Sequence, residues 1–333
     1  MSWFILTFRL KQQIIGLLDY ESRCNLRLSS KDDREAVDST KRIFKTLKIK
    51  ETQSELSEGK TIIRCDMDTL TIWLIGKENL TRIDRGWNGE IMEDASEIRH
   101  ENRYEILNRL LSWISIKGFI EAETVDIEGI QCHAPQNFKP KCKNLTLFNV
   151  GNQYFQTWMP KFLEVSKKFE KLEIQINGEE EEYGVWSMIS DTEVTKCIKL
   201  SHETRMTDEE LEKFEALDFR VESTWVTVDG ARKKLEKYLK FGTDSDILDL
   251  RIPEIDNFNA FEQLFSKNWT LKVIEREHLR EEEYSGKIVR GFENVHGNLK
   301  PRQIDVFIYG ETIRIWCGIY HPQPRFPCEL YPF

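Results

Sequence analysis

The spacing of apolar residues in the first forty positions is the strongest constraint on the fold. Within Arg9–Asp38, apolar side chains recur at helical intervals in two groups, separated by a polar break after Leu18. The groups are Leu10, Ile14, Ile15, Leu17 and Leu18, and then Leu26, Leu28, Ala36 and Val37. Asp and Ser in the break, Asp19–Ser22, can end one helix and cap the next. The pattern predicts two or three short helices whose apolar face either packs on the rest of the chain or serves as a docking surface.

Composition limits the classes of partner. With 333 residues, 40% hydrophobic and 11% aromatic, the chain can form a real core in one large domain or several modules. A net charge of −9 without a basic stripe argues against nucleic acid. No stretch approaches the roughly 20 apolar residues of a membrane helix. The seven cysteines are irregularly spaced, and the N-terminal sequence lacks the marks of a secretory signal, so we expect reduced thiols and a cytoplasmic or nuclear location.

Strand patterns follow the helical segment. Ser39–Lys50 is compatible with either a helix or a strand, and the next strands are bounded by turn residues. The strands are expected over Thr61–Cys65, Thr69–Ile75 and Leu80–Ile83, with turns at Asp66–Asp68 and Asp84–Asn88. The apolar spacing from Tyr104 to Ile114 then predicts an amphipathic helix over Asn102–Ile116.

Short strands and helices alternate through the next part of the chain. The strands are expected over Val125–Ile130, Leu145–Val150, Leu172–Ile176, Cys197–Ser201, Phe219–Ser223, Ile247–Ile252 and Leu271–Ile274. The helices are expected over Trp158–Phe169, Asp208–Glu215, Asp229–Leu239 and Ala260–Phe265. Thr207 and Glu210 have the spacing of a capping box. A strand-plus-helix unit at this period is typical of leucine-rich solenoids, whereas an ordinary α/β domain would produce the same alternation.

The C-terminal part returns to antiparallel patterns. Strands are expected over Gly286–Phe292, Gln303–Ile308 and Thr312–Gly318, with a tight turn at Tyr309–Glu311 and a proline-rich tail from His321. The predicted fold class is α+β with α/β repeats. Its expected parts are a helical segment over residues 1–45, strands plus an amphipathic helix over 46–120, a β/α repeat-like region over 121–280, and a hairpin with its tail over 281–333.

The sequence contains no convincing catalytic constellation. Cys132, His133 and Cys142 could supply three metal ligands, but the paired short spacing of zinc sites is absent, and a loop pair plus a buried cysteine is the simpler interpretation. Asp66 and Asp68 lie close together, as turn-forming residues commonly do. We therefore expect no enzyme activity, no cofactor and no metal.

The segment from Leu6 to Asp38 resembles an F-box. The match consists of the first-helix residues Ile14, Ile15, Leu17 and Leu18, the break Asp19-Tyr20, the second-helix run Leu26, Leu28, Ser29, Ser30 and Lys31, and the closing Val37. Leu6-Thr7 stands where the family pattern has Leu-Pro. Residues 69–90, TLTIWLIGKENLTRIDRGWNGE, the helix around Leu107–Leu111, and the closing QIDVFIYGETIRIWCGI resemble the F-box-associated (FTH- or FBA-like) regions of the large nematode F-box families.

This resemblance implies an adaptor subunit of an SCF-type ubiquitin ligase. The N-terminal helices would bind a Skp-type adaptor, and through it a cullin scaffold, while the C-terminal region would hold a protein substrate whose identity the sequence does not reveal. The residues implied in adaptor binding are Leu6, Leu10, Ile14, Ile15, Leu17, Leu18, Leu26, Leu28 and Val37. The alternative is a non-catalytic, solenoid-like interaction module without a ubiquitin role, in which the same helical face would pack on the chain itself.

Overall fold

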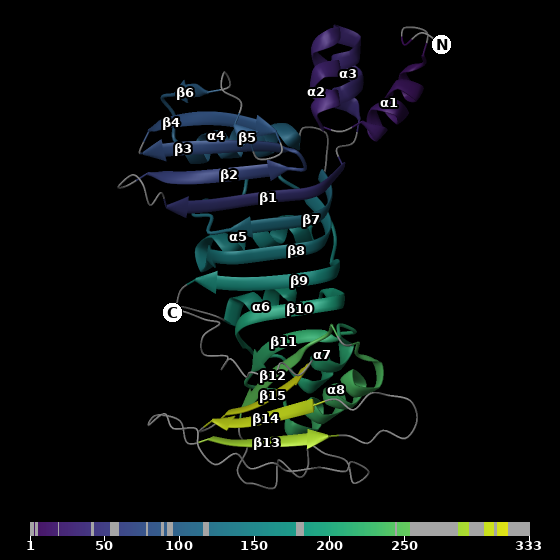
Figure 1. The fold of residues 1–333 in the computed structure, drawn as a ribbon, viewed down its shortest axis with the longest axis vertical. Coiled ribbons are helices and arrows are strands. Elements are labelled where there is room, and N and C mark those ends of the chain that lie inside the picture. Colours follow the sequence, from purple (N-terminus) through teal and green to yellow (C-terminus); the bar gives the residue numbers. More distant parts are fainter. Residues whose placement is uncertain are drawn as a thin grey trace. The chain divides into compact units, whose positions relative to one another are not determined.

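A computed structural model gives the fold in two compact units, Met1–Val194 and Thr195–Phe333 (Figure 1). The structure describes residues 3, 6–18, 20–40, 43–53, 60–77, 79–87, 90–91, 96–115, 120–177, 183–243, 245–253, 286–292, 303–309 and 312–318. Both units combine helices with β-sheet, as the sequence predicts. The boundary between the units falls inside the region expected over residues 121–280.

Three short helices open the first unit, in agreement with the apolar spacing. They are α1 (Phe8–Leu17), α2 (Tyr20–Ser29) and α3 (Lys31–Ser39). The Thr7 hydroxyl caps α1 by accepting a hydrogen bond from the Leu10 amide at 3.4 Å. The Ser30 hydroxyl caps α3 by accepting from the Asp33 amide at 3.1 Å. Each cap satisfies one of the free N–H groups of a first helical turn, so two polar residues define where these helices begin.

The rest of the first unit is a mixed sheet with helices packed on it. Its strands are β1 (Ile43–Gln53), β2 (Thr61–Met67), β3 (Leu70–Lys77), β4 (Leu80–Trp87), β5 (Glu90–Ile91), β6 (Glu97–Arg99), β7 (Ile120–Glu128), β8 (Pro140–Gly151) and β9 (Lys168–Asn177). Their order is β9-β8-β7-β1-β2-β3-β4-β5, and β6 pairs with β4. β1 runs parallel to β7 and antiparallel to β2, so it joins a parallel half to an antiparallel half.

The core of this unit lies between one sheet face and its helices. Helix α4 (Arg103–Ile114) packs on β3, α5 (Asn152–Leu163) packs on β8 and β9, and the short α6 (Tyr183–Ile189) follows β9. The opposite sheet face carries polar side chains, because alternate strand residues point to opposite faces. On that face Lys48 pairs with Asp126 across β1 and β7 at 3.4 Å, and Lys50 pairs with Glu128 at 2.7 Å.

The second unit repeats the strand-then-helix order. Its strands are β10 (Glu193–Thr204), β11 (Asp218–Ser223), β12 (Leu248–Pro253), β13 (Gly286–Phe292), β14 (Gln303–Tyr309) and β15 (Thr312–Gly318), with helices α7 (Asp208–Lys213) and α8 (Val228–Phe241) between the first three strands. β10, β11 and β12 are parallel and in sequence order, and the antiparallel β13-β14-β15 joins β12 through β15.

A buried lysine fixes α8 against the end of α7. The Lys234 ammonium donates to the carbonyls of Phe214 and Ala216 at 3.0 and 2.9 Å and lies 4.3 Å from the centre of the Phe219 ring. Burial, reinforced by the nearby Lys237, lowers the pKa of Lys234 to about 7. All of its bonds are internal to the fold, which makes it a packing element of the second unit.

Several predicted elements are confirmed and several boundaries are corrected. The helix predicted over Asn102–Ile116 is α4, and the strand predicted over Phe219–Ser223 is β11. The capping box at Thr207 is present. The predictions for Leu271–Ile274, Ala260–Phe265, the end of the Tyr309–Glu311 turn and the proline-rich tail lie outside the described residues.

The turn predicted at Asp84–Asn88 is wrong, because β4 continues through Trp87. Gly86 allows the backbone of β4 to lie close to that of β5, because a Cβ at this position would be 2.1 Å from the Glu90 carbonyl oxygen. The Asp66–Asp68 turn is displaced: Asp66 lies in β2, and the turn depends on Asp68, whose φ is 55°. The helix predicted over Trp158–Phe169 is α5, which begins and ends earlier because β9 already starts at Lys168.

Candidate functional site

Among the described side chains, the apolar core that the three N-terminal helices share is small. It consists of Ile15, Ala36 and Val37, with Trp3 and Leu26 partly buried against it. Ile15 is 0% exposed. The sequence implicated Ile15 and Val37 in partner binding, but the structure places both side chains in the interior, where they hold the helices together.

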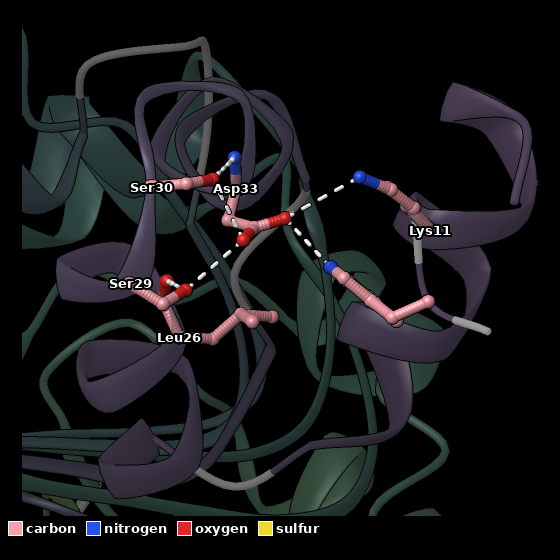
Figure 2. Close-up of polar contacts among 6 residues, drawn as sticks. Lys11, Leu26, Ser29, Ser30 and Asp33 are labelled. Atoms are coloured by element: carbon pink, nitrogen blue, oxygen red, sulfur yellow. Dashed lines mark hydrogen bonds and ion pairs between the residues drawn. The ribbon is translucent and has the colours of Figure 1, made fainter. Parts of the chain in front are cut away.

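A buried carboxylate joins the parts of this segment. Asp33 accepts hydrogen bonds from the Trp3 indole at 2.7 Å and the Lys11 ammonium at 3.4 Å. It also accepts from the hydroxyls of Ser29 at 3.0 Å and Ser30 at 2.7 Å. Figure 2 shows the carboxylate between Lys11 of α1 and the two serines at the α2–α3 junction. We call Asp33 and these four donors the Asp33 hub.

The hub stabilises the ionised form of Asp33. The hydrogen bond from Trp3, followed by those from Ser30, Ser29 and Lys11, lowers the pKa of Asp33 to about 2, although burial acts in the opposite direction. The carboxylate is therefore an anion at every physiological pH. Such an anion requires its donors, because a buried charge that loses its partners is strongly destabilising.

Further polar contacts fix the helices to one another. Arg23 of α2 donates to the carbonyls of Leu18 and Gly16 at the end of α1, both at 3.0 Å. Arg27 pairs with Asp38 of α3 at 2.8 Å. The Arg27 guanidinium also lies 5.7 Å from the ring centre of Trp113 in α4, so the helical segment contacts the body of its own unit. Polar bonds therefore help to order the segment beside its described buried apolar groups, Ile15, Ala36 and Val37.

Large apolar side chains remain on the outside of these helices. Leu17 is 88% exposed and Leu28 is 74% exposed, while Phe8 and Leu10 are exposed to 47% and 38%. Of the other predicted residues, Leu6, Ile14, Leu18 and Leu26 are half-buried. The structure thus brings Leu10, Leu17 and Leu28 to the surface. Sequence reasoning missed Phe8, whose position directly after the Thr7 cap was the available signal.

The rest of the described chain contains no group of three or more side chains placed to hold a metal ion. Cys132 and Cys142 are buried, and burial raises the pKa of each thiol to about 12. His133 is exposed and contacts the Tyr154 ring edge-on at 5.4 Å. These three residues therefore do not converge on one point in the described structure.

A second buried carboxylate, Glu51, has a structural environment. It accepts from the Tyr104 hydroxyl at 2.5 Å and from the Gln131 amide at 2.9 Å. Arg103 lies 3.7 Å away. Burial and the bond to Glu51 raise the pKa of Tyr104 above its ordinary range. Because these contacts join the end of β1 to α4 and to the loop after β7, they account for the conformation of this carboxylate.

Comparison with known proteins gives no family assignment. No protein-family model, no curated protein and no solved structure matches this chain significantly. Among the described residues, no helix has the length and apolar character needed to cross a membrane. The functional argument therefore depends on the residues and geometry of the three helices.

Proposed function

We propose that the chain is a substrate-recognition adaptor of an SCF-type ubiquitin ligase. In this proposal α1–α3 form an F-box that binds a Skp-type adaptor and, through it, a cullin scaffold. The strand–helix region beyond them, a degenerate leucine-rich-repeat-like or F-box-associated fold, holds a protein substrate. The proposal assigns no chemistry to the chain, which positions a substrate for a separate enzyme.

The observation that carries the proposal is the exposure of Leu17 and Leu28 on two helices of one segment. Full burial of a leucine side chain is worth about 1.5–3 kcal/mol, so two such residues left in water favour a partner that covers them. Phe8 and Leu10 extend the apolar surface along α1. A protein interface of ordinary size, about 1,600 Å² in total, would be large enough to cover this surface.

The rigidity of the segment supports the same proposal. The Asp33 hub and the Arg23 contacts hold the helices without using Leu17 or Leu28. A preorganised surface binds more tightly than one that must order itself, because less conformational entropy is lost on association. The polar contacts therefore support presentation of the apolar side chains to a partner.

The second candidate is a solenoid-like interaction module without a ubiquitin role. The observation that favours it is the sequential order of the parallel strands β7-β8-β9 and β10-β11-β12, with helices α5, α7 and α8 in every connection within these series except the one from β7 to β8. In that case the N-terminal helices would cap the strand–helix array, as terminal units of solenoids require. The Arg27 contact with Trp113 fits this alternative, because a cap contacts the body of its unit. The exposure of Leu17 and Leu28 is not explained by a capping role.

Binding to a purified Skp-type adaptor distinguishes the two candidates. Titration calorimetry with the full chain should give measurable affinity, and Leu17→Asp should weaken it at least about a hundredfold. The leucine contribution of about 1.5–3 kcal/mol is lost and a charge is buried without a partner, and each 1.4 kcal/mol is a factor of ten. Leu28→Asp should act in the same direction.

Ile98→Asp is the matched control, because Ile98 is 66% exposed but belongs to β6 and not to the three N-terminal helices. It should leave adaptor affinity unchanged. If the unaltered chain does not bind the adaptor, or if Ile98→Asp weakens binding as much as Leu17→Asp, the ubiquitin-ligase role is refuted. The non-ubiquitin module then becomes the better account of the fold.

A further inference from the structure

We propose that Ser29 is a phosphorylation site, and that a phosphate on its hydroxyl breaks the Asp33 hub and releases α1 from α3. The site lies in the α2–α3 junction, the position where the three helices are joined. The role of this modification in regulating partner binding rests on the proposed function. The structural effect on the helices does not.

Ser29 is accessible to a modifying enzyme. It is exposed and is the last residue of α2, immediately before the non-helical Ser30. Its hydroxyl donates to the Leu26 carbonyl at 2.6 Å and to the Asp33 carboxylate at 3.0 Å. Presenting an extended backbone to a kinase requires local opening of this junction, which transiently breaks the Ser29–Asp33 bond.

The charges that follow Ser29 define the class of enzyme. Asp32 stands three residues after Ser29 and is exposed, and Asp33 and Glu35 follow it. Acidic side chains on the C-terminal side of a serine are complementary to a kinase whose substrate groove is basic. The proposed enzyme class is therefore an acidophilic serine/threonine protein kinase acting with MgATP.

The transfer itself balances without further reactants. The Ser29 hydroxyl oxygen forms a bond to the γ-phosphorus of ATP, the bond from that phosphorus to the β,γ-bridging oxygen breaks, and ADP leaves. The hydroxyl proton passes to the kinase base and then to solvent. The product carries a charge of about −1.5 to −2 where a neutral donor stood.

That charge is placed against an existing anion. The Ser29 oxygen is 3.0 Å from an Asp33 carboxylate oxygen, so the phosphate would face Asp33 at close range and remove one of its donors. It would also lie between the C-terminal end of α2, where the helix dipole disfavours negative charge, and the N-terminal cap of α3, where the dipole favours it, so the helix dipoles add little to the effect. The phosphate competes with Asp33 for the Lys11 ammonium, which is the hub's ion pair to α1. Lys31 and Arg34 are exposed and can offset part of the charge, but they cannot restore the lost donor.

The first test phosphorylates the full chain with an acidophilic kinase and MgATP and maps the site by mass spectrometry. Ser29 should be labelled, Ser29→Ala should remove that label, and Asp32→Asn should slow its appearance. Amide exchange across Phe8–Leu17 should then accelerate about tenfold or more. A tenfold increase corresponds to a local opening free energy that is lower by about 1.4 kcal/mol. Phosphatase treatment should restore the original exchange, which separates a reversible release from irreversible unfolding.

Ser187→Glu is the matched control for the charge-mimicking variant Ser29→Glu. Ser187 is an exposed helical serine of α6 that also donates to the carbonyl three residues earlier, at 3.0 Å, and it lies outside the Asp33 hub. Ser29→Glu should accelerate exchange across α1, and Ser187→Glu should not.

The absence of phosphate on Ser29, or exchange in α1 that is unchanged by phosphate, overturns the inference. If the unmodified chain fails to bind the Skp-type adaptor, the proposed function fails instead; if it binds and the phosphorylated chain binds equally well, the regulatory role of Ser29 is refuted.

Discussion

Replacing Asp33 by alanine is expected to unfold the three N-terminal helices while the sheet of the first unit stays folded. The change removes the acceptor shared by Trp3, Lys11, Ser29 and Ser30. The serine hydroxyls can rotate toward other acceptors, whereas the indole N–H and the Lys11 ammonium are left in partly or fully buried positions.

The expected loss is about 3 kcal/mol. An unsatisfied buried donor costs about 1–3 kcal/mol, and the half-burial of Trp3 places its share at the lower end of that range. Among the described side chains, Ile15 and Val37 are the large, buried apolar groups of the segment's core, each worth about 1.5–3 kcal/mol. The hub therefore contributes as much as one of the two main core side chains, and its removal should open the segment locally.

Hydrogen exchange measured by mass spectrometry at pH 7 tests this magnitude. Peptides from α1–α3 should lose about a hundredfold in protection, which corresponds to roughly 3 kcal/mol, while peptides from β7 and β8 should not change. Asp33→Asn, which keeps the shape and one acceptor oxygen, should have an intermediate effect. If the exchange protection of α1–α3 in Asp33→Ala stays within a factor of about two of that in the unaltered chain, the hub is not the main link between these helices.

The same carboxylate predicts an acid transition. The folded pKa of Asp33 is about 2, below the ordinary value of about 3.9, so its stabilisation is present above pH 4 and is lost as the pH falls toward 2. Exchange-protected α1–α3 should therefore persist at pH 5 and weaken between pH 4 and 2, and Asp33→Ala should lack this dependence.

Three further substitutions and one control substitution test other parts of the fold. Gly129→Ala should destabilise the first unit by about 3 kcal/mol in urea unfolding, because φ is +68° and the new Cβ would lie 2.6 Å from the Glu51 carbonyl oxygen. Gly16→Ala should stabilise α1 by up to about 1 kcal/mol, because a Cβ at Gly16 would have no atom within 4 Å. Equal destabilisation by Gly129→Ala and Gly16→Ala would contradict this reasoning about glycine positions. His202→Phe should make the second unit less sensitive to acid: burial lowers the pKa of His202 to about 4 from about 6.5, so the unaltered unit loses about 2 kcal/mol between pH 7 and 5 as the unfolded chain takes up the proton. His100→Phe, at an exposed position, should leave that pH dependence intact.

Sequence periodicity located elements better than it located their ends. The apolar spacing from Tyr104 to Ile114 is long and amphipathic, and α4 forms there within two residues of the predicted bounds. Gly86 was misleading, because a glycine that permits close backbone approach has the same sequence signal as a glycine in a turn. The early start of α5 could not be predicted from its polar first residues, since its stability comes from packing on β8 and β9.

The sequence predicted that the candidate site is an apolar helical face, but it did not predict which of the apolar residues are buried and which are exposed. Ile15 and Leu17 belong to the same apolar group in the sequence, yet Ile15 is buried and Leu17 is 88% exposed. Only the packing of α1 on α3 separates them. The role of Asp33 was also invisible in the sequence, because its partners Trp3 and Lys11 are 30 and 22 residues away and no local spacing connects them.

The cross-strand pairs on the open sheet face of the first unit have a consequence for association rates. Lys48 and Lys50 on β1 are neutralised by Asp126 and Glu128 on β7, so this part of the surface projects little electric field into solvent although the chain carries a net charge of −9. These four side chains by themselves would not steer a partner to this face, and an unsteered encounter proceeds at roughly 10⁵–10⁶ M⁻¹s⁻¹ with little response to added salt. Recognition on this face would then be decided after contact, by the fit of side chains over short distances.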